Sequence, residues 1–278
     1  MKIGFYYFAT DYSMPIVEVA RALEEHGYES LFVPEHTHIP ASRRSPWPGG
    51  PELPKHYSHT LDPYVGLAAA AAVTNKLRLG TGVSLLTERD PIVTAKTVAT
   101  LDLISNGRFE FGIGAGWNAE EMENHGTRFE DRFRVMVDRA KAMKAIWTQE
   151  AAAYEGAFVE FEPIWSWPKP VQKPHPPILL GGETKYTLRR VMEFGDGWFP
   201  RGRGFEDPKA EMARLKRFAE EAGRDVRTVS TTLFGAKPEQ GYIEQCRAAG
   251  LDRALFALPP EGRDRVMPVI EKYTALIG

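Results

Sequence analysis

The hydrophobic positions fall into short apolar runs that alternate with segments of helical periodicity. Runs such as Leu31–Val33 and Ile178–Leu180 have no polar interruption, which is typical of strands covered on both faces. Each run is followed by a loop, an amphipathic segment and a helix-stopping residue, often glycine. We predict strands at 2–8, 29–34, 77–85, 108–114, 177–181, 196–199, 227–233 and 252–257. We predict helices at about 14–26, 63–74, 91–105, 130–148, 184–194, 207–222, 238–248 and 261–277.

Eight consecutive strand–helix units without a linker predict the fold class. The pattern favours an α/β protein, a closed (β/α)8 TIM barrel in which residues 1–278 form one domain. The alternative is an open doubly wound sheet, because Gly112 and Gly114 resemble the start of a dinucleotide-binding fingerprint. That fingerprint requires a third glycine where this chain has Trp117, and the number of units favours the barrel.

Two long insertions interrupt the regular spacing. Residues 35–62, after the second strand, are rich in proline and contain His36, His38, His56 and His59, so we expect a lid or pocket wall. Residues 150–176, before the fifth strand, are expected to form a short hairpin or extended excursion whose aromatic side chains, Trp165 and Trp167 among them, pack as a small satellite core. The four histidines could form a metal site, but the chain has no helical HExxH motif, and we predict no metal.

Composition excludes several classes of partner. The net charge of −2 and the pI of about 6.4 argue against binding to nucleic acid or to a membrane surface. The longest apolar run, residues 65–73, is too short to span a bilayer and is mostly alanine. The only cysteine, Cys246, cannot form an internal disulfide, and the chain begins without an apolar signal region, so we expect a cytoplasmic protein.

Candidate chemistry lies at the carboxyl ends of the predicted strands, where barrel enzymes bind their ligands. Glu35 and His36 follow the second strand and provide an acid and an imidazole suited to proton transfer. The third and fourth strands end in the glycine-rich segments 80–84 and 112–118, and the sixth ends in Trp198-Phe199. Such small and aromatic residues predict a broad planar cofactor across the barrel mouth.

The fifth strand ends in Gly181-Gly182, directly before a predicted helix. Thr184 can cap that helix, whose amino end would attract a phosphate or carboxylate, and Lys185 and Arg189 add positive charge. A tight strand-to-helix turn with no ligand is the alternative. In a barrel, this turn is the predicted anchor for a cofactor phosphate.

Five segments in this order resemble the bacterial luciferase-like superfamily, most closely its branch of probable coenzyme F-420-dependent oxidoreductases. The segments are HGYESLFVPEH, KLRLGTGV, NGRFEFGIGAGWNAEE, WPKPVQKPHPPILLGGET and GDGWFP. They lie within residues 1–200, and the similarity after about residue 205 is generic. The resemblance implies a homodimer whose cofactor ring lies at the carboxyl end of the barrel.

The resemblance also implies roles for individual residues. It implies hydride transfer between coenzyme F-420, an 8-hydroxy-5-deazaflavin, and a small organic substrate, with His36 as proton donor or acceptor and Glu35 tuning or orienting it. Two alternatives stay open: an FMN-dependent monooxygenase that uses reduced flavin and oxygen, and a non-catalytic flavin- or deazaflavin-binding protein. The implied cofactor-binding residues are Gly82, Val83, Ser84, Ala115, Gly116, Asn118, Gly181, Gly182, Glu183 and Thr184.

Overall fold

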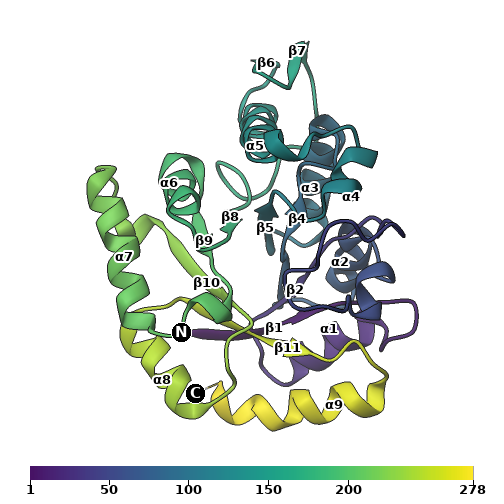
Figure 1. Cartoon of the computed structure of the whole chain (residues 1–278), viewed down its shortest axis with the longest axis vertical. Helices are drawn as coiled ribbons and strands as arrows, with labels where there is room; N and C mark the ends of the chain where they lie inside the picture. The colour runs from purple at the N-terminus through teal and green to yellow at the C-terminus, as the bar shows by residue number, and fades with distance from the viewer. Residues whose placement is uncertain (278) are drawn as a thin grey trace.

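The computed structural model describes residues 1–277, in which parallel strands form a closed ring (Figure 1). The sheet order is β3-β2-β1-β11-β10-β9-β8-β5-β4, and an additional pairing of β3 with β5 closes the ring. This closure confirms the (β/α)8 barrel and excludes the open doubly wound sheet. The barrel strands are β1 (Lys2–Tyr7), β2 (Ser30–Val33), β3 (Arg78–Thr81), β4 (Ser84–Leu85), β5 (Phe109–Gly114), β8 (Ile178–Gly181), β9 (Gly197–Phe199), β10 (Ser230–Phe234) and β11 (Arg253–Leu258).

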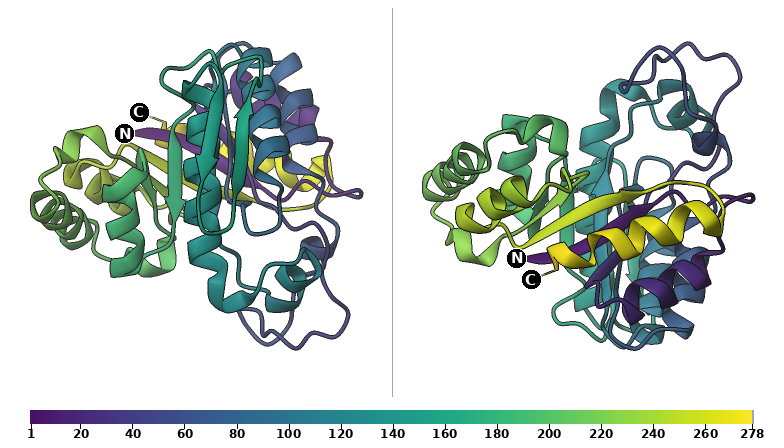
Figure 2. Two further views of the ribbon diagram at one scale, coloured as in Figure 1. Left: turned by 90° about the horizontal axis from the view of Figure 1, so that it is seen from above. Right: turned by 90° about the horizontal axis from the view of Figure 1, so that it is seen from below.

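The first and last strands lie side by side (Figure 2). They pair along their whole length, from Lys2 opposite Arg253 to Tyr7 opposite Leu258. On the other side of β11, β10 pairs only as far as Leu255. The end of β11 therefore has a neighbouring strand on one edge only.

Helices surround the ring, and three of them begin at an Asp-Pro pair as their sequence predicts. The side chains of Asp62, Asp90 and Asp207 each accept backbone N–H groups of the first helical turn. No helix within residues 1–277 is long and apolar enough to cross a membrane. The helices are α1 (Ile16–Glu25), α2 (Pro63–Ala72), α3 (Pro91–Ile104), α4 (Ala119–Asn124), α5 (Arg132–Thr148), α6 (Lys185–Phe194), α7 (Pro208–Glu221), α8 (Gln240–Ala249) and α9 (Arg263–Lys272).

The predicted elements differ from the observed ones in three places. The predicted strand at 77–85 is divided into β3 and β4 at a cis peptide bond between Gly82 and Val83. The predicted strand at 227–233 begins only at Ser230, because Asp225 accepts a hydrogen bond from the N–H of Arg227 and starts a 3-10 turn. Helix α4, which has six residues, was not predicted from the sequence. Only the late start of β10 lies at the end of a predicted element, where short-range hydrogen bonds decide the conformation.

The insertion before the fifth strand forms a hairpin, as expected. Strands β6 (Ala152–Glu155) and β7 (Glu160–Ile164) pair in antiparallel fashion and extend away from the ring, at the top of Figure 1. The aromatics that follow were expected to pack as a small core. Trp165 is 81% exposed and Trp167 is 58% exposed, so that expectation is wrong for these two side chains.

A buried ionic cluster lies at the amino ends of the strands. Arg253, the first residue of β11, donates two hydrogen bonds of 2.7 Å to Glu110 of β5 and bonds of 2.7 and 2.8 Å to Glu29. Arg78 also pairs with Glu110. Burial alone would raise the pKa of Glu110, but Arg253 and Arg78 hold it below its usual value. Each buried acid therefore has an arginine partner.

Candidate functional site

Glu35 lies at the carboxyl end of the ring but points into its wall. The carboxylate is 2% exposed and accepts hydrogen bonds from Ser84 Oγ at 2.8 Å and from the N–H of Leu85 at 2.7 Å. Arg89 pairs with its other oxygen. The prediction that Glu35 orients His36 is wrong, because these three partners from the β4 segment occupy the carboxylate. Glu35 instead fixes β4 to the end of β2.

His36 is oriented by Glu121, a residue that the sequence did not single out. Nδ1 of His36 lies 2.8 Å from Oε2 of Glu121, and the N–H of Thr37 donates to the other oxygen at 3.1 Å. Glu121 is fully buried. Because Glu121 occupies Nδ1, the nitrogen left for a ligand is Nε2, which has no hydrogen-bond partner within residues 1–277. Such a histidine can give or take a proton at one defined atom.

Aromatic side chains surround the His36 ring. Its centroid lies 5.2 Å from that of Tyr57 and 5.8 Å from that of Trp117. Tyr57 comes from the insertion at 35–62, which therefore forms a wall of the pocket, as predicted. Its ring also lies 5.0 Å from Phe8, which follows β1. The insertion thus joins the end of β2 to the end of β1.

A second buried acid, Glu88, lies next to Glu121. It is 8% exposed, and neither of its oxygens meets a hydrogen-bond donor in the described part of the chain. Burial is the main cause that raises the pKa of the Glu88 carboxyl to about 9, and the nearby charges of Glu121 and Glu35 raise it further. Glu88 is therefore a neutral acid at neutral pH.

The predicted seat for a cofactor ring is formed by three strand ends. Val83, after the cis peptide bond, packs between Gly114 of β5 and Gly181 of β8. A Cβ on Gly114 would lie 2.6 Å from Val83 Cγ2, and one on Gly181 would lie 3.1 Å from Cγ1. Gly82 lies against the rings of Phe199 and Phe234. Glycine at these positions allows Val83 to lie flat across the carboxyl ends of the strands.

The predicted residues of the fourth strand end are close together, but mainly serve the local structure. Asn118 caps α4 by accepting the N–H of Glu121 at 3.3 Å, and it is 2% exposed. The carbonyl oxygen of Ala115 accepts a hydrogen bond from Thr87. Gly116 has a φ of +76° and covers Glu88 and Met122. These residues hold the glutamates of α4, Glu120 and Glu121, at the carboxyl end of the barrel.

The predicted anion site at the amino end of α6 is only partly available. Thr184 caps the helix by accepting the N–H of Thr187 at 3.1 Å, and Gly182 has a φ of +120°. Glu183 pairs with Arg201 through two bonds of 2.7 Å, and Arg201 holds the pKa of Glu183 below its usual value against the effect of burial. The pair cancels the negative charge of Glu183 at this turn.

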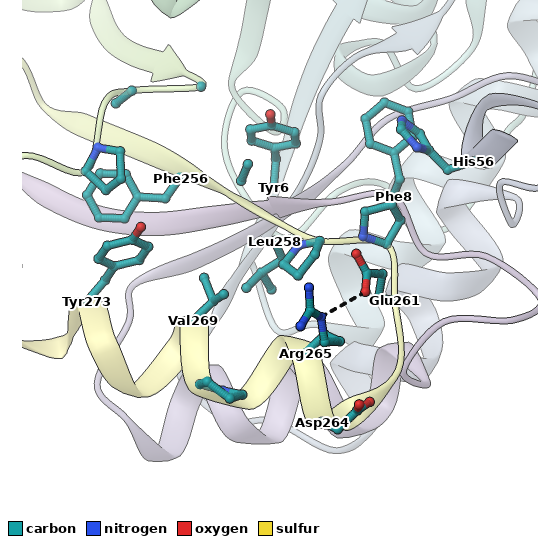
Figure 3. Close-up of a pocket in the computed structure, with 17 residues that line it drawn as sticks. Tyr6, Phe8, His56, Phe256, Leu258, Glu261, Asp264, Arg265, Val269 and Tyr273 are labelled. Atoms are coloured by element: carbon teal, nitrogen blue, oxygen red, sulfur yellow. Dashed lines mark hydrogen bonds and ion pairs between the residues drawn. The ribbon is translucent and has the colours of Figure 1, made fainter. Parts of the chain in front are cut away.

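A cavity of about 730 Å³ adjoins the mouth on the side of β1 and β11 (Figure 3). Tyr6, Phe8 and His56 form its inner part, and Val269 and Tyr273 of the α9 segment form its outer part. It runs past the end of β11, where β10 no longer pairs. Of the residues singled out from the sequence, His56 of the insertion lines the cavity, whereas none of the predicted catalytic or cofactor-binding residues does. Tyr6 connects it to the mouth, because its ring stacks on Phe234 at 3.9 Å.

The histidines of the insertion do not converge. His36 contacts Glu121, His38 lies near His125, and His59 pairs with Asp11. No group of three or more His, Cys, Asp or Glu side chains in residues 1–277 is arranged to hold a metal ion. The residues that sequence reasoning missed are Glu88, Glu121 and Arg89. Their only signal was the acidic pair Glu120-Glu121 and the charged run Glu88-Arg89-Asp90 at the ends of apolar segments.

Comparisons with known proteins agree with this architecture. The family model for luciferase-like monooxygenases matches residues 10–240. The uncharacterized protein Rv0953c of Mycobacterium tuberculosis is 39% identical over 284 residues, which cover 100% of this chain and 99% of that protein.

Two solved structures share the fold over almost their whole length. The monooxygenase RslO1 from Streptomyces bottropensis has a TM-score of 0.78 at 19% identity, and the match covers 100% of this chain and 98% of the RslO1 chain. An F420-dependent secondary alcohol dehydrogenase, solved with an F420–acetone adduct, has a TM-score of 0.79 at 17% identity. This match covers 99% of this chain and 98% of the dehydrogenase chain. With the matching family model, these similarities show that the chain belongs to the luciferase-like monooxygenase family.

Proposed function

We propose that this protein is an oxidoreductase that transfers a hydride between coenzyme F-420 and a small organic substrate. The observation that carries the proposal is the orientation of His36: Glu121 occupies Nδ1 and leaves Nε2 without a partner among the described residues, at the same carboxyl end of the barrel as the glycine-lined seat of Val83. A histidine in that position suits a reaction in which one proton accompanies one hydride. Members of this family are oxidoreductases or monooxygenases, and the F420-dependent alcohol dehydrogenase has the same fold.

The described residues fit a deazaflavin or flavin. Val83 and the half-buried rings of Tyr6 and Phe234 give an apolar floor for a planar ring. The cofactor's phosphate would lie at Gly181–Thr184, where the amino end of α6 and the exposed Lys185 favour an anion. When bound, a deazaflavin supplies or takes up a hydride, whereas a reduced flavin can also activate oxygen. The same proposal places four further residues behind the cofactor ring: Ser84, Ala115, Gly116 and Asn118.

In the proposed reaction, His36 handles the proton. When a carbonyl substrate is reduced, His36 Nε2 would give a proton to the carbonyl oxygen as hydride reaches the carbon, so that an alcohol forms. In the reverse direction the same nitrogen takes the alcohol proton. Tyr57 and Trp117 hold the imidazole from the sides and exclude water from it.

We infer that the substrate binds in the cavity beside β11, within reach of the mouth. Its lining is mostly aromatic or apolar, which suits a largely apolar small molecule. Ala257 lines the cavity, and its side chain is exposed. Ala257→Trp should fill the cavity and raise KM while the affinity for the cofactor stays the same; an unchanged KM would place the substrate elsewhere.

Titration of the purified protein with F-420 and with FMN, followed by fluorescence quenching, tests the cofactor. We expect tight binding of F-420; tight binding of FMN alone would favour the alternative, an FMN-dependent monooxygenase. If neither binds, the enzyme hypothesis fails. If one binds but no oxidation or reduction of it is coupled to any small molecule, the protein is a non-catalytic flavin-binding protein. Turnover that survives in His36→Ala would exclude the proton-transfer role.

The same proposal includes a cytoplasmic homodimer built from one barrel domain over residues 1–278. Helices α2 and α3 lie side by side and expose apolar side chains, of which Val65 is 72% and Val93 is 64% exposed. Such a surface is typical of a protein–protein interface. Val65→Asp combined with Val93→Asp should convert the dimer to a monomer in analytical ultracentrifugation. A wild-type monomer would contradict this part of the proposal.

A further inference from the structure

The mouth of the barrel contains more buried acid than the buried cations can balance. The groups that face Glu88 are Glu121 on α4, Glu35 after β2 and Arg89 in its own segment. Arg89 is already bonded to Glu35 and, at 2.6 Å, to Asp62. Arg139 of α5 donates to the carbonyl oxygen of Leu86, and no cation among residues 1–277 forms an ion pair with Glu88.

Burial and the nearby carboxyl groups of Glu121 and Glu35 raise the pKa of Glu88, so this acid keeps its proton at neutral pH. The hydrogen bonds agree with this placement of the proton. Glu121 accepts bonds from His36 and from the N–H of Thr37. Glu88 has no donor among residues 1–277. The proton therefore lies on Glu88, which can donate it as a hydrogen bond to Glu121.

We propose that Glu88 is a positioning residue that, as a neutral acid, holds the Glu121 carboxylate on Nδ1 of His36 and makes the site sensitive to alkaline pH. Donation from Glu88 fixes the position of the Glu121 carboxyl group, so that His36 presents Nε2 to the mouth. When Glu88 loses its proton, two like charges face each other behind His36, and the arrangement loosens. The functional part of this inference rests on the proposed role of His36; the geometric part does not.

The test follows the His36 ring by NMR as a function of pH, in the protein without cofactor, with assignment by His36→Asn. In the wild type we expect a change of the His36 signal near pH 9, where Glu88 ionises. In Glu88→Gln that change should disappear, because the amide can still donate to Glu121 but cannot lose a proton. In Glu88→Gln at pH 7, the Nδ1–H signal of His36 should remain as in the wild type.

Two further variants separate positioning from folding. Glu88→Met keeps the length of the side chain but removes the donor, so the Nδ1–H signal should broaden or vanish at pH 7, and Glu88→Gln should retain it. Glu123→Gln, on the exposed part of α4, should leave the His36 titration unchanged. Circular dichroism shows whether each variant is folded.

The outcomes distinguish this inference from the proposed function. A step near pH 9 that persists in Glu88→Gln, or that is absent from the wild type, would overturn the inference while cofactor binding could still succeed. If the step depends on Glu88 but neither F-420 nor FMN binds, the positioning role stands and the proposed function falls. If F-420 binds, its dissociation constant should rise above about pH 9 in the wild type and not in Glu88→Gln.

Discussion

Both ends of this barrel hold acidic groups away from water, but the two ends balance these charges differently. At the amino ends of the strands, Glu29 and Glu110 share the guanidinium of Arg253, and Arg78 adds a second cation. At the carboxyl ends, the buried acids Glu35, Glu88 and Glu121 have one arginine among them, and it is committed to Glu35. With every group ionised, the cluster at the amino ends is neutral. The three acids and one arginine at the carboxyl ends would instead sum to a charge of −2, and a proton kept on Glu88 reduces this excess to −1.

This difference separates a structural cluster from a functional one. A buried charge that meets its partners in good geometry has no reason to titrate near neutral pH, and it ties strands together. A buried acid without a partner holds its proton to high pH and lowers the stability of the folded protein, an arrangement common where proton transfer occurs. The carboxyl end of a (β/α)8 barrel is also where catalytic groups lie, whereas the amino end serves stability.

The largest expected effect comes from breaking the balanced end. Arg253→Met leaves Glu29 without its arginine and Glu110 with only Arg78, so the free energy of unfolding should fall by about 3–5 kcal/mol. Urea denaturation measures this loss. Arg227→Met, which removes an exposed pair with Asp225, is the matched control and should have no measurable effect. A loss no larger than that of the control would show that the cluster does not stabilise the barrel.

The second effect has the opposite sign, at the unbalanced end. The unfolded chain loses the Glu88 proton near the ordinary carboxyl range, whereas the fold retains it to about pH 9. Unfolding therefore releases a proton between these values, and stability contributed by the neutral acid falls as the pH rises through that window. Glu88→Gln carries no such proton, so it should be more stable than the wild type.

The expected gain of Glu88→Gln is about 2 kcal/mol at pH 7, and it changes by at most about 1.4 kcal/mol per pH unit. Urea denaturation at pH 5, 6, 7 and 8 measures it. The difference between the two proteins should be smallest at pH 5 and widen toward pH 8. Parallel stability curves over this range would mean that Glu88 is ionised in the fold, contrary to the comparison of the two ends.

The sequence predicted the barrel and the end at which the site lies, but not which side chains meet there. Strand positions follow from local apolar runs, and the carboxyl ends of parallel strands must lie at one end of the ring. His36 therefore fell in the right region. Its partner Glu121 is 85 residues away and lies on a helix of one and a half turns, and Arg89 is 54 residues from Glu35. Such pairings depend on loop paths that periodicity does not encode.

The cavity was missed for a related reason. Its lining comes from β1, the insertion at 35–62, the end of β10 and the α9 segment, which no motif connects. It exists because β11 continues past Leu255 while β10 turns away. A difference of a few residues in strand length is within the error of strand ends predicted from sequence.

The smallest expected effect refines the balanced end. Arg78 is 30% exposed, and Glu110 keeps both bonds from Arg253 when Arg78 is removed. Arg78→Met should therefore lower the free energy of unfolding by less than about 1 kcal/mol in the wild type, as for a partly exposed ion pair.

In the Arg253→Met background, the same substitution leaves the buried Glu110 with no cation and should cost about 2 kcal/mol more than it does alone. Urea denaturation of the four proteins of this double-mutant cycle measures the coupling. Additive losses would mean that the two arginines act independently, and that the amino end is a set of separate pairs and not one cluster around Arg253.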